Sequence, residues 1–185
     1  MLVLASNSPR RQQILKDAGI PFVVRVPNIH EERHPGEPPE EYARRLAEHK
    51  ALAVPRSNDE IVLAADTVVV VGGEVLEKPV DAPDALRMLR LLSGREHEVI
   101  TGICLLSGSR TIMGAATTRV RFLKLSEPEM TAYAASGEPM DKAGGYAIQG
   151  LASKFIDRVE GCYFNVVGLP IALVYQHLKA LGAAL

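Results

Sequence analysis

The stretch IVLAADTVVVVGGEVLEKP, residues 61–79, decides the fold. Its first eleven residues form an apolar run interrupted by the carboxylate of Asp66, and such a run is typical of a strand. A two-residue turn at Gly72 and Gly73 follows, and the next residues return as a second strand. The stretch therefore predicts a β-hairpin that carries one charged side chain inside an apolar strand.

On either side of the hairpin, short apolar runs alternate with segments of helical periodicity. Residues 28–39 interrupt this alternation, because three prolines disfavour a helix there. Hairpins combined with crossovers predict an α/β (mixed α+β) fold with a mixed, partly antiparallel sheet flanked by helices. Since no repeat or linker is present, residues 1–185 are expected to form a single domain, with a bilobed form as the variant. We expect strands at 1–5, 22–26, 97–107, 117–125 and 154–159, and helices at 9–18, 40–54, 81–93, 126–136 and 169–181.

The overall composition excludes several classes of protein. The 185 residues include 21 basic and 22 acidic side chains, so the formal net charge of −1 creates no field that attracts nucleic acid or an anionic membrane. Cys104 and Cys162 stand far apart without further metal-ligand spacing, so we expect reduced core thiols and no disulfide framework or structural zinc site. No apolar run approaches the roughly 18 residues of a membrane span, and no signal peptide is recognisable, so we expect a cytoplasmic protein.

Asp66 is the first candidate for chemistry. An ionised carboxylate among apolar neighbours costs several kcal/mol unless something neutralises it. The partner is a divalent cation, an arginine or a lysine, or else the carboxyl group is protonated with a raised pKa, as in a tuned general base. The alternative is a structural aspartate at a strand end that bonds nearby amides. The pattern favours a functional role.

Lys50 presents a parallel case on the helix predicted at 40–54. At about 100° per residue, Lys50 falls near the middle of an apolar stripe. A lysine in that position either runs past the stripe to water or points into a polar cleft. Its position alone leaves both alternatives open.

The helix start within LASNSPRR, residues 4–11, is a candidate anion site. Backbone N–H groups at a helix start, the hydroxyl of Ser8 and the guanidinium groups of Arg10 and Arg11 all suit phosphate oxygens. The alternative is that Ser8 merely caps the helix and that both arginines lie in water. The local pattern supports these two interpretations equally.

HEERH, residues 30–34, matches the H-E-x-x-H pattern of zinc proteases. The prolines around it and the lack of apolar residues within it make the required helix implausible. Glu31 and Glu32 are better interpreted as loop carboxylates, which are either solvated or join Asp66 around a hard cation such as Mg²⁺.

Two further segments carry candidate ligand groups. Residues 138–150 combine glycines, which allow close approach of the backbone to a ligand, with Gln149, whose amide both donates and accepts as reading a base edge requires. Lys142 lies in the same segment, and Lys78 follows the hairpin. The alternative for these residues is a plain, solvent-facing loop.

Taken together, these stretches resemble the Maf family of nucleoside triphosphate pyrophosphatases, once named for an association with septum formation. The motifs LASNSPRR, AADTVV, LEKP, LSGREHEVITG, GEPMDKAGGYAIQG and EGCYFNVVGLP follow in the family's order and run nearly end to end. The segment DKAGGYAIQG is similar to the branch that acts on dTTP and UTP. The resemblance implies cleavage between the α- and β-phosphates, which releases a nucleoside monophosphate and pyrophosphate, with a divalent metal cation, Mg²⁺ or Mn²⁺.

The resemblance also implies roles for individual residues. Asp66 matches the proposed proton acceptor, and Glu31 is the expected co-base and second metal ligand, with Glu32 as the alternative because the register of this loop is open. The family further implies two lobes around a cleft, similar to the inosine triphosphate pyrophosphatases, and a homodimer. Specificity positions are Arg10, Thr67 and Gln149, and phosphate-binding positions are Ser8, Arg11, Lys50, Lys78 and Lys142.

Two other functions stay open at this point. One is house-cleaning of modified pyrimidine nucleotides such as 5-methyl-UTP, and the other is a nucleotide-binding regulator of cell division with incidental hydrolysis. The acidic residues favour an enzyme over a pure binder. Direct binding of nucleic acid is disfavoured, because the chain has no tryptophan and only 5% aromatic residues.

Overall fold

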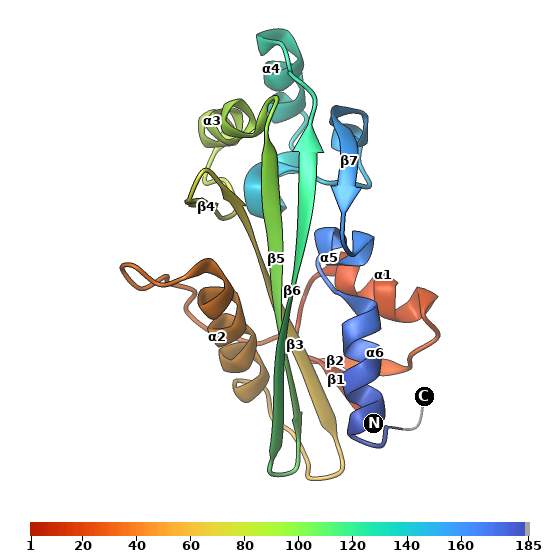
Figure 1. Ribbon diagram of the computed structural model, residues 1–185. Helices are drawn as coiled ribbons and strands as arrows, with labels where there is room; N and C mark the ends of the chain where they lie inside the picture. Colours follow the sequence, from red (N-terminus) through yellow and green to blue (C-terminus); the bar gives the residue numbers. More distant parts are fainter. Residues whose placement is uncertain (184–185) are drawn as a thin grey trace. The chain divides into compact units, whose positions relative to one another are not determined.

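A computed structural model describes residues 1–183, so the last two residues of the predicted 1–185 domain lie outside the described residues. Within that range seven strands form one sheet: β1 (Leu2–Leu4), β2 (Phe22–Val24), β3 (Ile61–Val71), β4 (Glu74–Leu76), β5 (Glu96–Ser107), β6 (Arg110–Phe122) and β7 (Ile156–Glu160). Their order is β2-β1-β3-β5-β6-β7, with β4 paired to β3 (Figure 1). β1 pairs in parallel with β2 and β3, whereas the β3–β4 and β6–β7 pairs are antiparallel. The predicted mixed sheet is confirmed.

The capping signals in the sequence fix the starts of several helices. The side chain of Asp81 accepts the N–H of Asp84 at 2.8 Å, and Ser126 with Glu129 forms a capping box.

No described helix is both long and apolar enough to cross a membrane. The helices within residues 1–183 are α1 (Pro9–Asp17), α2 (Pro39–Leu52), α3 (Ala82–Leu92), α4 (Glu127–Ala135), α5 (Tyr163–Val167) and α6 (Ile171–Ala180), with the 3₁₀ helices η1 (Glu138–Asp141), η2 (Ala143–Gly145) and η3 (Leu151–Phe155).

Some predicted elements need correction. The strand predicted at 117–125 is β6, which begins already at Arg110, because pairing within the sheet overrides the weak strand preference of its glycine and alanines. The strand predicted at 154–159 starts at Ile156, after η3. Helix α5 was not predicted, since its sequence YFNVV favours a strand. Cys162 is half-buried instead of lying in the core, because it occupies the turn between β7 and α5.

The chain divides into two compact units. Unit 1 comprises Met1–Thr67, Thr101–Ala116 and the chain from Gly168 onward, and unit 2 comprises Val68–Ile100 and Thr117–Val167. Strands β3, β5 and β6 contribute residues to both units. The single domain and the cleft expected from the sequence stay predictions.

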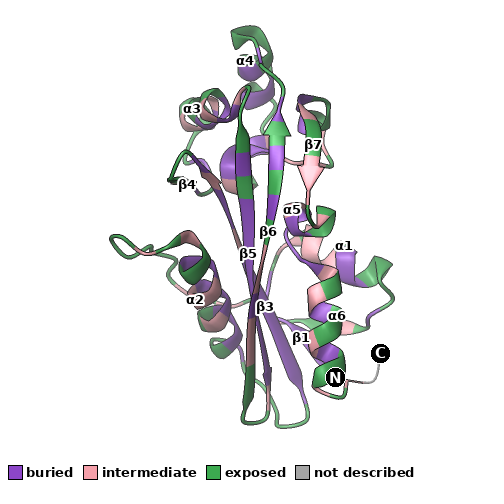
Figure 2. Ribbon diagram, viewed as in Figure 1, coloured by how far each residue is buried: buried purple, intermediate pink, exposed green. Residues whose placement is uncertain are grey.

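Helix α2 packs directly on the sheet in unit 1. Ala47 of α2 shares a buried cluster with Val62 of β3 and Cys104 of β5. Figure 2 shows buried residues along all three elements. Small residues permit this approach, since a Cβ atom on Gly102 would lie 2.4 Å from the carbonyl carbon of Ala43. The face of α2 that carries Ala43 and Ala47 therefore packs closely against β3 and β5.

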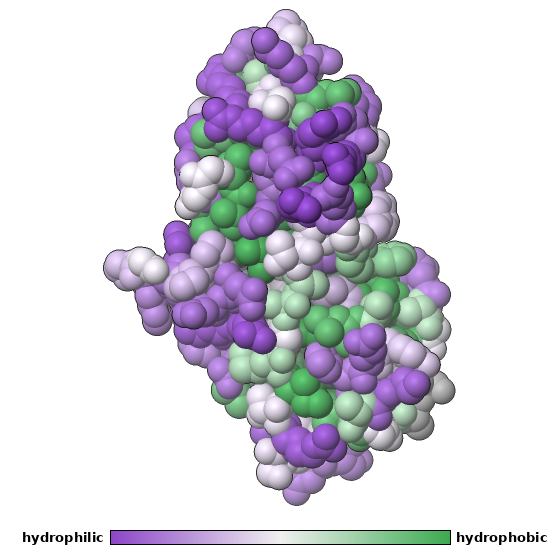
Figure 3. All heavy atoms as spheres, in the orientation of Figure 1, coloured by the Kyte–Doolittle hydropathy of each residue, from purple (hydrophilic) through white to green (hydrophobic). Residues whose placement is uncertain are grey.

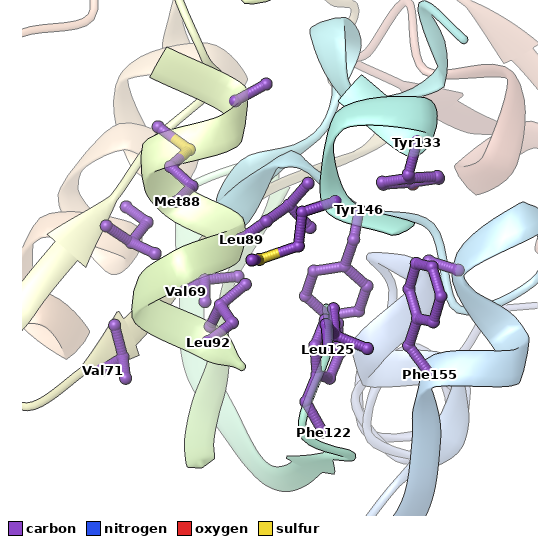
Figure 4. Packing of buried hydrophobic residues seen from close by; sticks show 14 of the residues in the cluster. Val69, Val71, Met88, Leu89, Leu92, Phe122, Leu125, Tyr133, Tyr146 and Phe155 are labelled. Carbon is purple, nitrogen blue, oxygen red and sulfur yellow. The ribbon is translucent and has the colours of Figure 1, made fainter. Parts of the chain in front are cut away.

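Unit 2 has an aromatic core, which Figure 4 shows beside Leu89 and Leu92. The rings of His97, Phe122 and Tyr146 meet edge to face, with centroids 4.9–5.3 Å apart. Nε2 of His97 lies 2.7 Å from the Tyr146 hydroxyl, and His97 is only 2% exposed. Burial lowers the pKa of this imidazole to about 4, so His97 is neutral at physiological pH.

Candidate active site

Asp66 lies within β3 and contacts Lys50 from the last turn of α2. Nζ of Lys50 is 2.5 Å from Oδ1 of Asp66, and each residue is 8% exposed. Lys50 therefore does not run past its apolar stripe to water, and the polar contact is the interpretation that the structure supports. Burial raises the pKa of the Asp66 carboxyl, although the cations Lys50 and Arg11 oppose that rise.

Glu31 reaches the same ammonium from the loop before α2. Its Oε1 lies 2.8 Å from Nζ of Lys50, so two carboxylates share one cation. Glu32 instead lies 3.4 Å from Nε2 of His30, and its side chain is exposed. The structure thus brings Glu31, and not Glu32, to the ammonium that Asp66 contacts.

Arg11 of α1 is held by three oxygen atoms of unit 1. Its Nε donates to the carbonyl of Gly168 at 2.8 Å, Nη1 donates to Oγ of Ser6 at 3.3 Å, and Nη2 donates to Oγ1 of Thr67 at 3.2 Å. The hydroxyl of Thr67 in turn hydrogen-bonds Thr101 at 2.9 Å. Burial lowers the pKa of the Arg11 guanidinium, and neighbouring carboxylates oppose that change. Arg11 is therefore a fixed cation and not a solvated one.

The hydroxyl of Ser8 caps α1. It accepts the N–H of Arg11 at 3.5 Å, while the N–H of Ser8 donates to Oγ of Ser6 at 3.2 Å. The capping interpretation therefore holds for Ser8. Arg10, in the first turn of α1, is half-buried, and its charge also lowers the pKa of Arg11. Arg10 and Arg11 thus lie at the N-terminal end of α1, where the helix dipole favours anions.

The remaining predicted residues belong to unit 2. Nζ of Lys142 donates to the carbonyl of Glu138 at 2.7 Å and lies 2.5 Å from Oδ1 of Asp141. Gln149 and Lys78 are exposed on loops. The structure thus assigns Ser8, Arg10, Arg11, Glu31, Lys50, Asp66 and Thr67 to unit 1, and Lys78, Lys142 and Gln149 to unit 2.

Glu138 organises the segment that carries Lys142 and Gln149, a role that the sequence interpretation missed. Its carboxylate accepts the hydroxyl of Tyr133 at 2.8 Å and the N–H of Leu151 at 3.0 Å. The segment also needs Gly150, because a Cβ atom there would lie 2.3 Å from Oε2 of Glu138. Burial alone would raise the pKa of Glu138, but these bonds lower it overall. An acidic residue inside a glycine-containing motif was the available signal.

Comparison with protein families matches residues 1–181 to the family described as Maf-like protein. The chain belongs to the Maf family. Relatives named dTTP/UTP pyrophosphatase include those of Koribacter versatilis (48% identical), Symbiobacterium thermophilum (50%) and Geobacter sulfurreducens (49%), each matched over 98% of this chain and over 94%, 94% and 97% of the relative. Among solved structures, the Staphylococcus aureus Ham1 protein matches 65% of this chain and 71% of its own, with a TM-score of 0.44 and 20% sequence identity.

Two carboxylates of this Maf family chain suit a small, hard cation. Mg²⁺ is usually held by one or two carboxylates together with water and substrate phosphates. Asp66 and Glu31 both contact Nζ of Lys50, so their oxygens already converge on one positive charge. Among residues 1–183 no group of three or more His, Cys, Asp and Glu is placed to hold an ion, so other oxygens would complete the coordination. The segment HEERH, residues 30–34, contains no helix, so the zinc protease arrangement does not form.

Proposed function

We propose that the chain hydrolyses dTTP and UTP to the nucleoside monophosphate and pyrophosphate. The observation that carries this proposal is the buried contact between Asp66 and Lys50, to which Glu31 adds a second carboxylate. A carboxyl group of raised pKa beside a fixed ammonium is typical of sites that activate water. Relatives 48–50% identical over 98% of the chain, all named dTTP/UTP pyrophosphatase, support the same reaction.

Asp66 is the proposed general base. Its carboxylate takes a proton from water as the water oxygen bonds to the α-phosphorus, while the bond from that phosphorus to the bridging oxygen breaks. The electron pair of the broken bond leaves with pyrophosphate, and the proton remains on Asp66. The raised pKa suits this role, because a base accepts a proton most effectively when its pKa approaches the working pH.

The cations of unit 1 are the proposed partners of the phosphate charges. Lys50 pairs with two carboxylates in the free protein, and a triphosphate offers it a stronger anionic partner. Its departure frees Asp66 to act as a base. Lys50 and Arg11, with Arg10, then stabilise the charge that develops on leaving pyrophosphate.

Asp66 and Glu31 are the residues that would hold Mg²⁺ or Mn²⁺. When bound, the cation supplies charge neutralisation at the phosphates and lowers the pKa of a bound water. We propose Ser8, Lys78 and Lys142 as further phosphate-binding residues. Arg10, Thr67 and Gln149 are the proposed specificity residues. In the cell, we propose a cytoplasmic homodimer that removes non-standard or modified pyrimidine nucleotides.

Isotope labelling tests the proposed bond cleavage. The chain is incubated in H₂¹⁸O with dTTP, UTP, CTP, GTP and 5-methyl-UTP, each with EDTA, Mg²⁺ or Mn²⁺, and the products are analysed by mass spectrometry. We expect metal-dependent release of pyrophosphate from dTTP and UTP, with ¹⁸O in the monophosphate. Release of orthophosphate, or ¹⁸O in pyrophosphate, would overturn the assignment. Activity without added metal in EDTA would remove the cation from the proposal.

A further inference from the structure

We infer that Arg45 and Glu37 form a clamp that positions Glu31, which makes Arg45 a positioning residue for the reaction. The inference deepens the proposed function and rests on it, because it assigns the loop carboxylate a fixed place. The hydrogen bonds of both residues go to each other and to the loop before α2, and not to Asp66 or Lys50. Both lie in unit 1, as does every residue they hold.

Arg45 donates three hydrogen bonds to the loop that precedes α2. Its Nε donates to Oε1 of Glu37 at 2.6 Å and its Nη2 donates to Oε2 of Glu37 at 2.8 Å, which is the bidentate geometry of a strong charge-assisted pair. Nη2 also donates to the backbone carbonyl of Glu32 at 2.9 Å. The guanidinium stacks 5.5 Å from the centre of the buried Tyr42 ring, which restricts its position further. One side chain of α2 therefore holds both ends of the loop segment 32–37.

Glu37 extends the clamp along the loop. Its carboxylate also accepts the N–H of His34 at 3.1 Å, and its carbonyl accepts Nη2 of Arg33 at 2.6 Å. The side chains of Arg45 and Glu37 are only 21% and 10% exposed, so water screens the pair less than it screens a surface salt bridge. Arg45 lowers the pKa of Glu37 to about 2, so the pair stays ionised at any pH used for assay.

The clamp matters because the loop has no other regular structure to fix Glu31. Residues 25–38 contain no helix or strand, and this segment and the outer side of α2 are hydrophilic on the face shown in Figure 3. Helix α2 holds two consecutive loop residues, since Lys50 contacts the carboxylate of Glu31 and Arg45 contacts the carbonyl of Glu32. When Lys50 turns to a phosphate, the Arg45 contact with the neighbouring Glu32 still holds the loop that places Glu31 for a metal or for water.

A double-mutant cycle tests whether Arg45 acts through Glu31. We measure kcat, KM and Mn²⁺ affinity for Arg45→Ala, Glu31→Gln and the double variant. Arg45→Lys serves as the conservative variant because it keeps the charge and loses the fork. The matched control is Arg44→Ala, which removes the neighbouring arginine of α2 and its exposed pair with Glu40. Thermal unfolding of every variant separates positioning from loss of fold.

We expect Arg45→Ala to lower kcat and Mn²⁺ affinity by about 10- to 100-fold, the scale measured when residues that orient a metal ligand are removed. The double variant should be no worse than Glu31→Gln within about twofold, and Arg45→Lys should recover part of the loss. Arg44→Ala should behave as the unchanged chain. Multiplicative losses in the double variant, or equal effects of Arg45→Ala and Arg44→Ala, would overturn the inference.

Hydrogen exchange tests the clamp independently of whether the proposed hydrolysis of nucleotides is correct. The segment 29–37 includes the hydrogen-bonded amides of His34 and Glu37, and it should exchange faster in Arg45→Ala than in Arg44→Ala, whether or not the chain hydrolyses nucleotides. If the unchanged chain hydrolyses no nucleoside triphosphate, the proposed function is wrong. The measurements of Mn²⁺ affinity and hydrogen exchange still test whether Arg45 positions the loop. If exchange of this segment is the same in both variants, the clamp itself is wrong.

Discussion

His97 makes the stability of unit 2 depend on pH in a way that can be calculated. Its imidazole is 2% exposed, and burial lowers its pKa from 6.5 to about 4. In that pH interval the imidazole is protonated in the unfolded chain, whereas the buried imidazole of the folded chain stays neutral. Each pKa unit corresponds to about 1.4 kcal/mol, so the difference of 2.5 between 6.5 and about 4 is worth about 3 kcal/mol.

The sign of the effect follows from the lowered pKa. The stabilisation is fully present above pH 6.5 and is lost as the pH falls toward 4. The substitution His97→Gln removes the ionisable group while leaving a polar side chain near the Tyr146 hydroxyl. We expect the variant to be less stable at pH 7, because it loses two edge-to-face ring contacts, and to lose about 3 kcal/mol less than the unchanged chain between pH 7 and pH 4.

Urea denaturation at pH 7, 5.5 and 4 measures this difference, and an NMR titration of the His97 ring gives its pKa directly. The matched control is His30→Gln, which removes an imidazole whose side chain is 86% exposed. Carboxylates whose protonation changes in this range contribute equally to all three proteins and cancel. The same pH dependence in His97→Gln and the unchanged chain, or a ring that titrates near pH 6.5, would refute the reasoning.

Three further outcomes are expected. Asp66→Asn should reduce turnover by at least about 100-fold in a chain that still folds, and near-normal turnover would remove Asp66 from the mechanism. Glu138→Ala should raise KM for UTP more than it lowers kcat, because the N–H of Leu151 loses its acceptor; steady-state kinetics that show an unchanged KM would contradict this. Gly102→Ala should cost about 1–3 kcal/mol in urea denaturation, since the new Cβ meets the backbone of Ala43 at 2.4 Å, and an equally stable variant would show that α2 can shift.

The residues that could be predicted from the sequence are those that break a pattern. Asp66 is the one charged residue in an apolar strand, and Lys50 lies in the apolar stripe of a helix. Each charge therefore needs a polar partner, and in the structure the two residues form an ion pair with one another. Arg45 and Glu37 break no pattern, because charges beside a polar loop are the ordinary composition of a solvated surface. Nothing in the sequence distinguishes their bidentate bond from exposure to water.

The same contrast explains the errors in the fold. Strands β1 and β3 and helix α2 were predicted because burial leaves a continuous apolar run in each strand and an apolar stripe on the helix. The first half of β6 carries polar and small residues and owes its conformation to its neighbours in the sheet. The five residues of α5 have strand-forming side chains, and tertiary contacts override that local preference.

The division of the chain into two units has a consequence for its synthesis. Unit 1 is assembled from three separate stretches and unit 2 from two, so neither unit is one continuous piece of polypeptide. The carbonyl that fixes Arg11 belongs to Gly168, far along the chain from the arginine it orders. A ribosome must therefore translate most of the message before Arg11 has this support, and neither unit can be grafted onto another protein as a single uninterrupted segment.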